Sequence, residues 1–240
     1  RFFYIKEMEG FFKRLKYYGT GLLIGLIFVT FFMRGRGCSW LPENRLKTSL
    51  FERIIVLSEE NQKKLSDLNL SEKELVKALI NGDVKFTKSK KNNSFKVYYF
   101  DCKTEAGKLF SCKATMPQES FISEIIFSNE DAKKIKNTKI GFGKPIYFPK
   151  SKDFVYVDTS DLLICQQEEL SLMNVNTLFN RIKKTGRIDF KKSMLNRSPK
   201  PEHWITFRGN NNKNISAKSI WYKEKIQILA LDLPDSSSCK

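Results

Sequence analysis

The chain has 240 residues, of which 41% are hydrophobic and 29% charged, a composition that fits a globular protein and excludes an intrinsically disordered one. Its net charge of +17 favours anionic partners, namely membrane head groups, nucleic acid or acidic proteins, although a solvated lysine-rich surface would give the same charge. The chain has a single histidine, no Cys-x-x-Cys pair and no phosphate-binding loop motif, so we expect neither a metal nor a cofactor.

The first part of the chain is expected to anchor it in a lipid bilayer. Residues 1–16 form a tail, and residues 17–33 (YYGTGLLIGLIFVTFFM) form an uncharged apolar run with basic residues on both sides. This pattern predicts a transmembrane helix of roughly 25 Å. Gly21 and Gly25 form a Gly-x-x-x-Gly step, where a helix of another membrane protein could pack closely, unless the pair is incidental.

Residues 34–70 are interpreted as a juxtamembrane linker with a short helix, which Ser58 is expected to cap. A first α+β unit is predicted at residues 71–130. Its helix starts with a capping box at Ser71, and Gly82 fits a left-handed cap at its end. Alternating or β-branched and aromatic residues then predict four strands, at residues 84–86, 95–101, 109–116 and 123–127.

The same pattern returns about 104 residues later, which indicates an internal duplication, with chance similarity as the alternative. Gly82 to Ser89 aligns with Gly186 to Ser193, and Val97–Phe100 aligns with Trp204–Phe207. A second unit is therefore predicted at residues 171–233, after a connecting segment at 131–170 and before a tail at 234–240. The predicted fold class is α+β: an N-terminal transmembrane helix followed by two small repeated α-β-β-β-β units.

One stretch after the apolar run carries a resemblance to a known family. It reads Cys38-Ser39-Trp40-Leu41-Pro42-Glu43-Asn44-Arg45, and with the anchor before it the chain resembles a family of small single-pass membrane proteins from Bacteroidota. The resemblance covers residues 14–127 and implies one soluble α+β domain, which is distantly similar to a family related to RelE-like toxins that cut RNA. The second copy of the unit departs from this pattern, and similarity of fold alone does not transfer function.

No catalytic set is evident in the sequence. A nucleophile that depends on a base usually requires a histidine, and His203 is the only one. It stands at the beginning of a predicted strand, where we expect a solvent-exposed side chain. We therefore expect that the protein is not an enzyme.

Two cysteines flank the predicted hairpin centred on Gly107. Cys102 and Cys112 are each five residues from this glycine, so they would lie opposite each other, close enough to form a disulfide bond. The alternative is a pair of small buried thiols.

Basic residues follow the Val/Ile-x-Phe strand in both predicted units and are candidate contacts for an anion, although such residues are often only solvated. They are Lys88, Lys90 and Lys91 in the first unit and Lys191, Lys192 and Arg197 in the second.

These observations predict a membrane-anchored, non-catalytic interaction protein. It would be an accessory subunit of a bacterial envelope complex, with a secretion or translocation machine as one candidate host. Its partners would be the lipid bilayer and other membrane proteins. The alternative is a membrane-tethered protein that binds nucleic acid or cleaves RNA as toxins do. We expect the protein in the bacterial inner membrane, with its soluble part in the periplasm because a Cys102–Cys112 bond would persist in an oxidising compartment.

Overall fold

The computed structural model describes residues 2–33, 41–90, 95–127, 141–149, 153–195, 197–210, 212–222, 225–233 and 238–239. Lys91, one of the candidate anion contacts, lies outside these residues. The chain divides into two compact units, residues 1–45 and residues 46–240. Each unit is described by itself.

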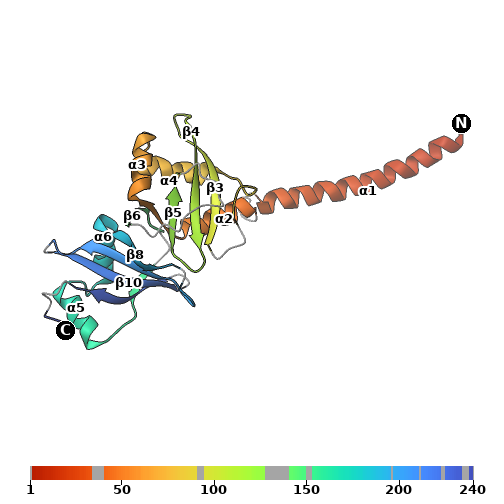
Figure 1. Ribbon diagram of the computed structural model, residues 1–240. Coiled ribbons are helices and arrows are strands. Elements are labelled where there is room, and N and C mark those ends of the chain that lie inside the picture. The colour runs from red at the N-terminus through yellow and green to blue at the C-terminus, as the bar shows by residue number, and fades with distance from the viewer. Residues whose placement is uncertain are drawn as a thin grey trace. The chain divides into compact units, whose positions relative to one another are not determined.

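The first unit is dominated by one long helix, α1 (Phe2–Met33), drawn in red in Figure 1. It is continuous through the predicted tail and the apolar run. Among the described residues, no helix is both long enough and apolar enough to cross a membrane. The predicted transmembrane helix at residues 17–33 is therefore wrong. The uncharged run of residues 17–33 spans roughly 25 Å of helix, whereas a hydrocarbon core is about 30 Å thick.

The second unit is built on one large mixed sheet. Its helices are α2 (Pro42–Phe51, which starts in the first unit), α3 (Glu59–Asp67), α4 (Glu72–Asn81), α5 (Asp161–Glu169) and α6 (Val175–Thr185). Its strands are β1 (Ile54–Ser58), β2 (Asp83–Val84), β3 (Phe95–Lys103), β4 (Leu109–Pro117), β5 (Ile122–Ile126), β6 (Phe142–Tyr147), β7 (Asp153–Tyr156), β8 (Arg187–Met194), β9 (Glu202–Arg208), β10 (Asn214–Tyr222) and β11 (Lys225–Asp232).

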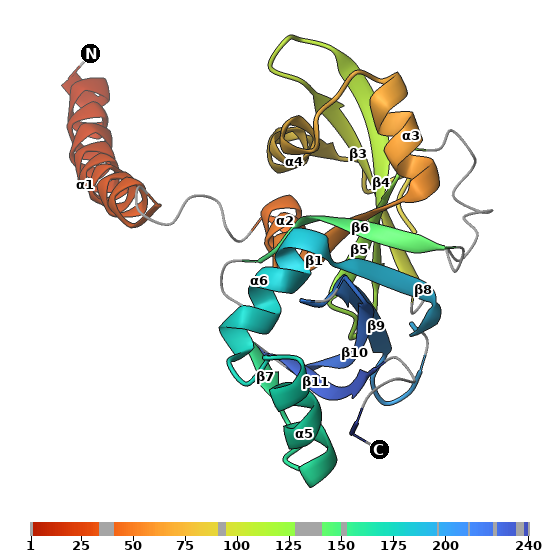
Figure 2. The ribbon, with the colours of Figure 1, turned by 90° about the vertical axis from the view of Figure 1, so that its left-hand side faces the viewer.

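The described strands form an 11-stranded sheet in the order β2-β3-β4-β5-β1-β6-β8-β9-β10-β11-β7 (Figure 2). The predicted fold class of two small separate units after a membrane helix is therefore wrong. We call residues 54–126 the N-terminal half and residues 153–232 the C-terminal half. In each half a first strand and two helices precede four further strands, and the first strand pairs in parallel with the last. Strand β6 pairs antiparallel with both β1 and β8 and so joins the halves.

The two halves also share local geometry. After α3, Asn69 has a φ of 52°, and after α5, Ser171 has a φ of 54°. The backbone N–H groups of residues 68–70 bond to carbonyls of α3 in the same pattern as those of residues 170–172 bond to carbonyls of α5. The repeated turn extends the similarity of the halves to the first strand and first helix of each, which the sequence pattern did not include.

A serine in each half makes the same pair of hydrogen bonds. Ser89 donates to the Lys85 carbonyl and accepts from the Tyr99 N–H, at 2.8 and 3.1 Å. Ser193 likewise donates to the Asp189 carbonyl and accepts from the Trp204 N–H, at 2.6 and 3.0 Å. Tyr99 therefore corresponds to Trp204, two residues from the expected alignment. The shift keeps each residue on its own face of the sheet, because side chains alternate with a period of two.

The caps of the helices follow the sequence closely. The capping box between Ser71 and Glu74 is confirmed, and the Ser58 hydroxyl accepts from the Asn61 N–H at the start of α3. Gly82 and Gly186, however, have extended backbones with φ of −73° and −65°, so the predicted left-handed cap is wrong at Gly82. Their lack of a side chain has a steric reason. A Cβ atom at Gly186 would lie 2.3 Å from the carbonyl oxygen of Ile182, so β8 can begin directly at the end of α6 only with glycine there.

Cys102 and Cys112 are free, buried thiols, so the predicted disulfide bond is not formed. The register explains this difference, because Cys102 pairs with Phe110 and Cys112 pairs with Phe100. The two cysteines are thus diagonal neighbours and not opposed residues. The neighbouring Cys102 side chain and burial raise the pKa of the Cys112 thiol. A disulfide bond instead joins Cys165 in α5 to Cys239 near the end of the chain.

His203 is fully buried, so the expectation of an exposed side chain is wrong. It lies in β9, where Ile205 and Phe207 also point into the core, and its ring packs 4.3 Å from that of Phe121. The Nε2 atom of His203 is 2.8 Å from the hydroxyl of Ser120, which precedes β5. The histidine therefore connects the C-terminal half to the N-terminal half.

Candidate anion-binding cleft

The basic residues selected from the sequence do not form one site. Lys88 is exposed in a turn, and Lys90 pairs with Val97 in an isolated bridge. Lys191 is exposed in β8. The Lys192 amine lies 3.0 Å from the Asp232 carboxylate, and Arg197 is paired with Glu202. The candidate contacts are thus spread over the unit, and two of them already bind carboxylates of the chain.

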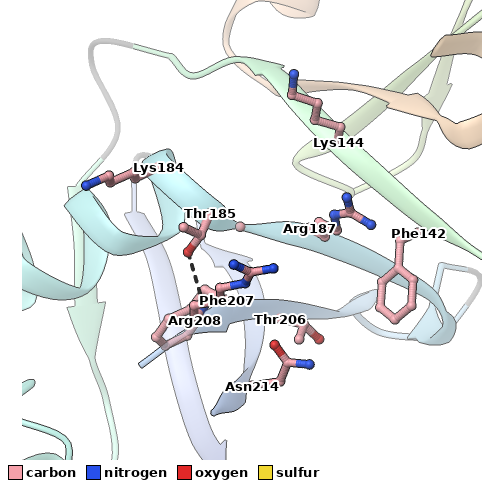
Figure 3. A pocket seen from close by; sticks show the side chains of 10 residues that line it. Phe142, Lys144, Lys184, Thr185, Arg187, Thr206, Phe207, Arg208 and Asn214 are labelled. Atoms are coloured by element: carbon pink, nitrogen blue, oxygen red, sulfur yellow. Dashed lines mark hydrogen bonds between the residues drawn. The ribbon is translucent and has the colours of Figure 1, made fainter. Parts of the chain in front are cut away.

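Other basic side chains converge at the place where α6 ends and β8 begins. A cleft of about 400 Å³ is open to solvent there, between β6, β8, β9 and the start of β10 (Figure 3). Four of its lining residues are basic, and an aromatic ring and an amide lie beside them. These basic, aromatic and amide residues are Phe142, Lys144, Lys184, Arg187, Arg208 and Asn214.

The alternation of the strands places all of these side chains except Lys184, which belongs to α6, on one face of the sheet. Ile188, Ile205 and Phe207 point into the core with the apolar residues of α6. Their neighbours Arg187 and Arg208 must therefore emerge on the opposite face. Arg187 pairs with Thr206, two residues before Arg208, so the two arginines are diagonal neighbours whose Cβ atoms lie about 7–8 Å apart.

The end of α6 holds this corner of the cleft in place. The Thr185 hydroxyl donates to the Arg181 carbonyl and accepts from the backbone N–H of Arg208, both at 3.1 Å. The dashed line in Figure 3 marks the bond to Arg208. Gly186 then lets the chain turn directly into β8. The helix end, the first residue of β8 and the last residue of β9 are thereby fixed to one another.

The charges of the cleft are only partly neutralised. The Lys144 amine lies 2.5 Å from the Glu72 carboxylate, and the Arg187 guanidinium lies 3.7 Å from Glu59. All four side chains are between 37% and 63% exposed, so each pair contributes little to stability and can be displaced by another anion. Within the described ranges, Lys184 and Arg208 form no ion pair. The cleft can therefore attract a carboxylate, phosphate or sulfate group.

The sequence does contain a signal for this cleft, apart from the basic residues that follow the Val/Ile-x-Phe strands. Residues 183–187 read Lys-Lys-Thr-Gly-Arg, a basic helix end followed at once by a glycine and a basic strand residue. Lys144 and Arg208 come from distant positions in the chain, and only the pairing of β6, β8 and β9 brings them to the same place.

A serine and a histidine are also in contact, but not at the cleft. Ser120 and His203 both have no exposed surface, so a substrate cannot reach either side chain. Burial, and then the nearby Arg53 guanidinium, lower the pKa of His203 to about 3. The ring is therefore neutral at pH 7 and acts as a hydrogen-bonding group of the core. Among the described residues, no group of three or more His, Cys, Asp or Glu side chains could hold a metal ion.

Comparisons with protein-family models, curated proteins and solved structures find no match to this chain. A function is therefore inferred from the geometry of the cleft. The resemblance to the Bacteroidota family and to toxin-related domains remains an expectation from the sequence.

Proposed function

We propose that this protein is a non-catalytic interaction protein that holds an anionic segment of a partner in the basic cleft. The observation that supports the proposal is the convergence of four basic side chains, two of which form no ion pair in the described part of the chain. The net charge of +17 adds a long-range attraction that would speed the encounter with such a partner.

A second observation supports a role as a subunit of a larger complex. Consecutive apolar side chains of α1 are more than half exposed, namely Leu22, Leu23, Ile24, Leu26, Ile27, Phe28 and Val29. Because consecutive residues point to all sides of a helix, this surface is apolar all round and would be enclosed by other helices. We place the complex in the bacterial envelope as part of the same proposal.

The cleft is tested by removing two of its charges. The double variant Arg187→Gln with Arg208→Gln is expected to bind hexaglutamate about tenfold more weakly than the unaltered chain, with a shallower dependence on salt, because two cationic contacts are lost. Fluorescence anisotropy of a labelled peptide measures both effects.

The matched control is Lys88→Gln with Lys191→Gln, which removes two exposed charges away from the cleft and keeps the same net charge as the double variant. Equal affinities for the control and the double variant would show that net charge, and not the cleft, attracts the anion.

The enclosure of α1 is tested in the cell that makes the protein. The chain is expected to be isolated in an assembly several times its own mass of 28.0 kDa, and Ile24→Lys with Phe28→Lys is expected to release it, because lysines would be buried without partners. Gel filtration of both forms measures this. The proposal would be contradicted if the double variant eluted at the same mass as the unaltered chain. It would also be contradicted if the unaltered chain were released only by a lipid-dissolving detergent and carried no protein partner.

A further inference from the structure

The strands that line the cleft carry a longer pattern of side chains on the same face of the sheet. Gly143 pairs with Ile188, so the next residues, Lys144 and Arg187, lie beside each other. Arg187 pairs with Thr206, and the line thus crosses β6, β8 and β9. We call Lys144 and Arg187 the basic row. The Thr206 hydroxyl lies 3.0 Å from the Ser216 hydroxyl of β10, which confirms that the line continues across the next strand.

A second line runs parallel to the basic row, two residues further along each strand and therefore about 7 Å away. Phe142 pairs with Asp189, and Asp189 pairs with Trp204. We call Phe142 and Trp204 the aromatic row. Since neighbouring strands are about 4.8 Å apart, the two rings are anchored about 10 Å from each other. Both side chains are half-buried.

The acidic residue between the two rings does not oppose an anion strongly. Asp189 is only 8% exposed, and its carboxylate accepts hydrogen bonds from the backbone N–H groups of Lys191 and Lys192 at 2.9 and 3.0 Å. The Lys192 amine, which is paired with the Asp232 carboxylate, also lies 5.4 Å from the centre of the Trp204 ring.

Two parallel rows of this kind fit a ligand with rings along one side and negative groups along the other. An aromatic ring has an electron-rich face, which suits the C–H face of a sugar ring. Two rings anchored about 10 Å apart can each take one sugar of a linear chain. The basic row would then bind carboxylate groups, while Thr206 and Asn214 offer hydrogen bonds to sugar hydroxyls. The disulfide bond between Cys165 and Cys239 is of a kind that persists in oxidising compartments such as the cell exterior and the bacterial periplasm.

From this geometry we infer that the anionic partner of the cleft is an acidic linear polysaccharide, with its sugar rings on Phe142 and Trp204 and its carboxylates on Lys144, Arg187 and Arg208. This inference rests on the proposed function and names the chemical class of the ligand.

The test compares three anions of similar charge on the full chain, by anisotropy of end-labelled probes: a hexauronate, hexaglutamate and a single-stranded DNA hexamer. Trp204→Ala is expected to weaken binding of the hexauronate about tenfold, as the loss of one main aromatic contact does, and to leave hexaglutamate binding unchanged. Trp204→Phe keeps a ring and is expected to retain at least half of the hexauronate affinity. Unchanged binding of hexaglutamate also shows that the variants are folded.

The outcomes separate this inference from the proposed function. If Trp204→Ala changes hexauronate binding no more than hexaglutamate binding, the polysaccharide assignment is overturned while the anion-binding cleft stands. If the DNA hexamer binds more tightly than the hexauronate and depends on Trp204, the ligand is a nucleic acid and the assignment is again overturned. If the double variant Arg187→Gln with Arg208→Gln binds all three anions normally, the cleft itself is rejected.

Discussion

Replacing Arg53 with methionine is expected to lower the free energy of unfolding by about 2–5 kcal/mol, because it removes a buried charged donor from two carbonyls far along the chain, and each buried carbonyl left unsatisfied costs about 1–3 kcal/mol. Arg53 is 8% exposed, and its guanidinium donates to the carbonyls of Pro117 and Ser120 at 2.7 and 2.5 Å. It also lies 5.4 Å from the centre of the Trp221 ring in β10. Methionine keeps the apolar packing but leaves both buried carbonyls without these donors. Urea denaturation measures the loss.

Arg187→Met is the control for this prediction, because its side chain is 59% exposed and its ion pair with Glu59 is long. It should change the unfolding free energy by less than about 0.5 kcal/mol. A loss below about 1 kcal/mol for Arg53→Met would show that water replaces the guanidinium at the two carbonyls.

The unfolding free energy is also expected to fall steeply as the pH is lowered from about 6.5 towards 3, because His203 cannot take up a proton while it is buried. Its pKa is lowered to about 3 by burial and by Arg53, against an ordinary value of 6.5. Between these pH values the unfolded chain binds a proton that the folded chain does not. The unfolding free energy therefore falls by about 1.4 kcal/mol per pH unit from this residue, and its contribution is constant above pH 6.5.

His203→Phe isolates this effect from the titration of carboxylates. The phenyl ring fits beside Phe121, and the Ser120 hydroxyl keeps its hydrogen bonds to the backbone of Ile122. Urea denaturation at pH 7, 6 and 5 measures the unfolding free energy of both proteins. As the pH falls, the unfolding free energy of the unaltered chain should decrease more than that of the variant. A difference that stays the same at all three pH values would mean that His203 takes up its proton with the same pKa in the folded and the unfolded chain.

Local features of the fold could be read from the sequence because their causes are local. The capping box at Ser71 and the cap at Ser58 each satisfy helix N–H groups within three residues. The strands β3 and β4 lie close to their predicted positions because their aromatic and β-branched residues stand on either side of a turn at Gly107, which has a φ of +85°.

The continuity of the sheet could not be read in this way. β1 pairs in parallel with β5, a distant strand, and β6 bridges the halves although it contains Gly143 and Pro145, residues that weaken a strand signal. The opposed arrangement predicted for Cys102 and Cys112 was wrong for a related reason. A shift of one residue in the centre of a hairpin turns an opposed pair into a diagonal one.

The burial of His203 was within reach of the sequence. His203, Ile205 and Phe207 alternate along one strand, and this period of two places the histidine on the apolar face. The cleft was only partly within reach, because Arg187 can be assigned to a strand after Gly186, whereas its position beside Lys144 depends on the pairing of β6 with β8.

Hydrogen–deuterium exchange with and without hexaglutamate tests most directly whether the cleft is where an anionic partner binds. We predict slower exchange in residues 184–188 at the end of α6 and in residues 206–210 at the end of β9, because a bound anion would hold together the elements that line the cleft. Slower exchange confined to residues 88–90 and 191–197, or no change in either region at a saturating peptide concentration, would contradict the account.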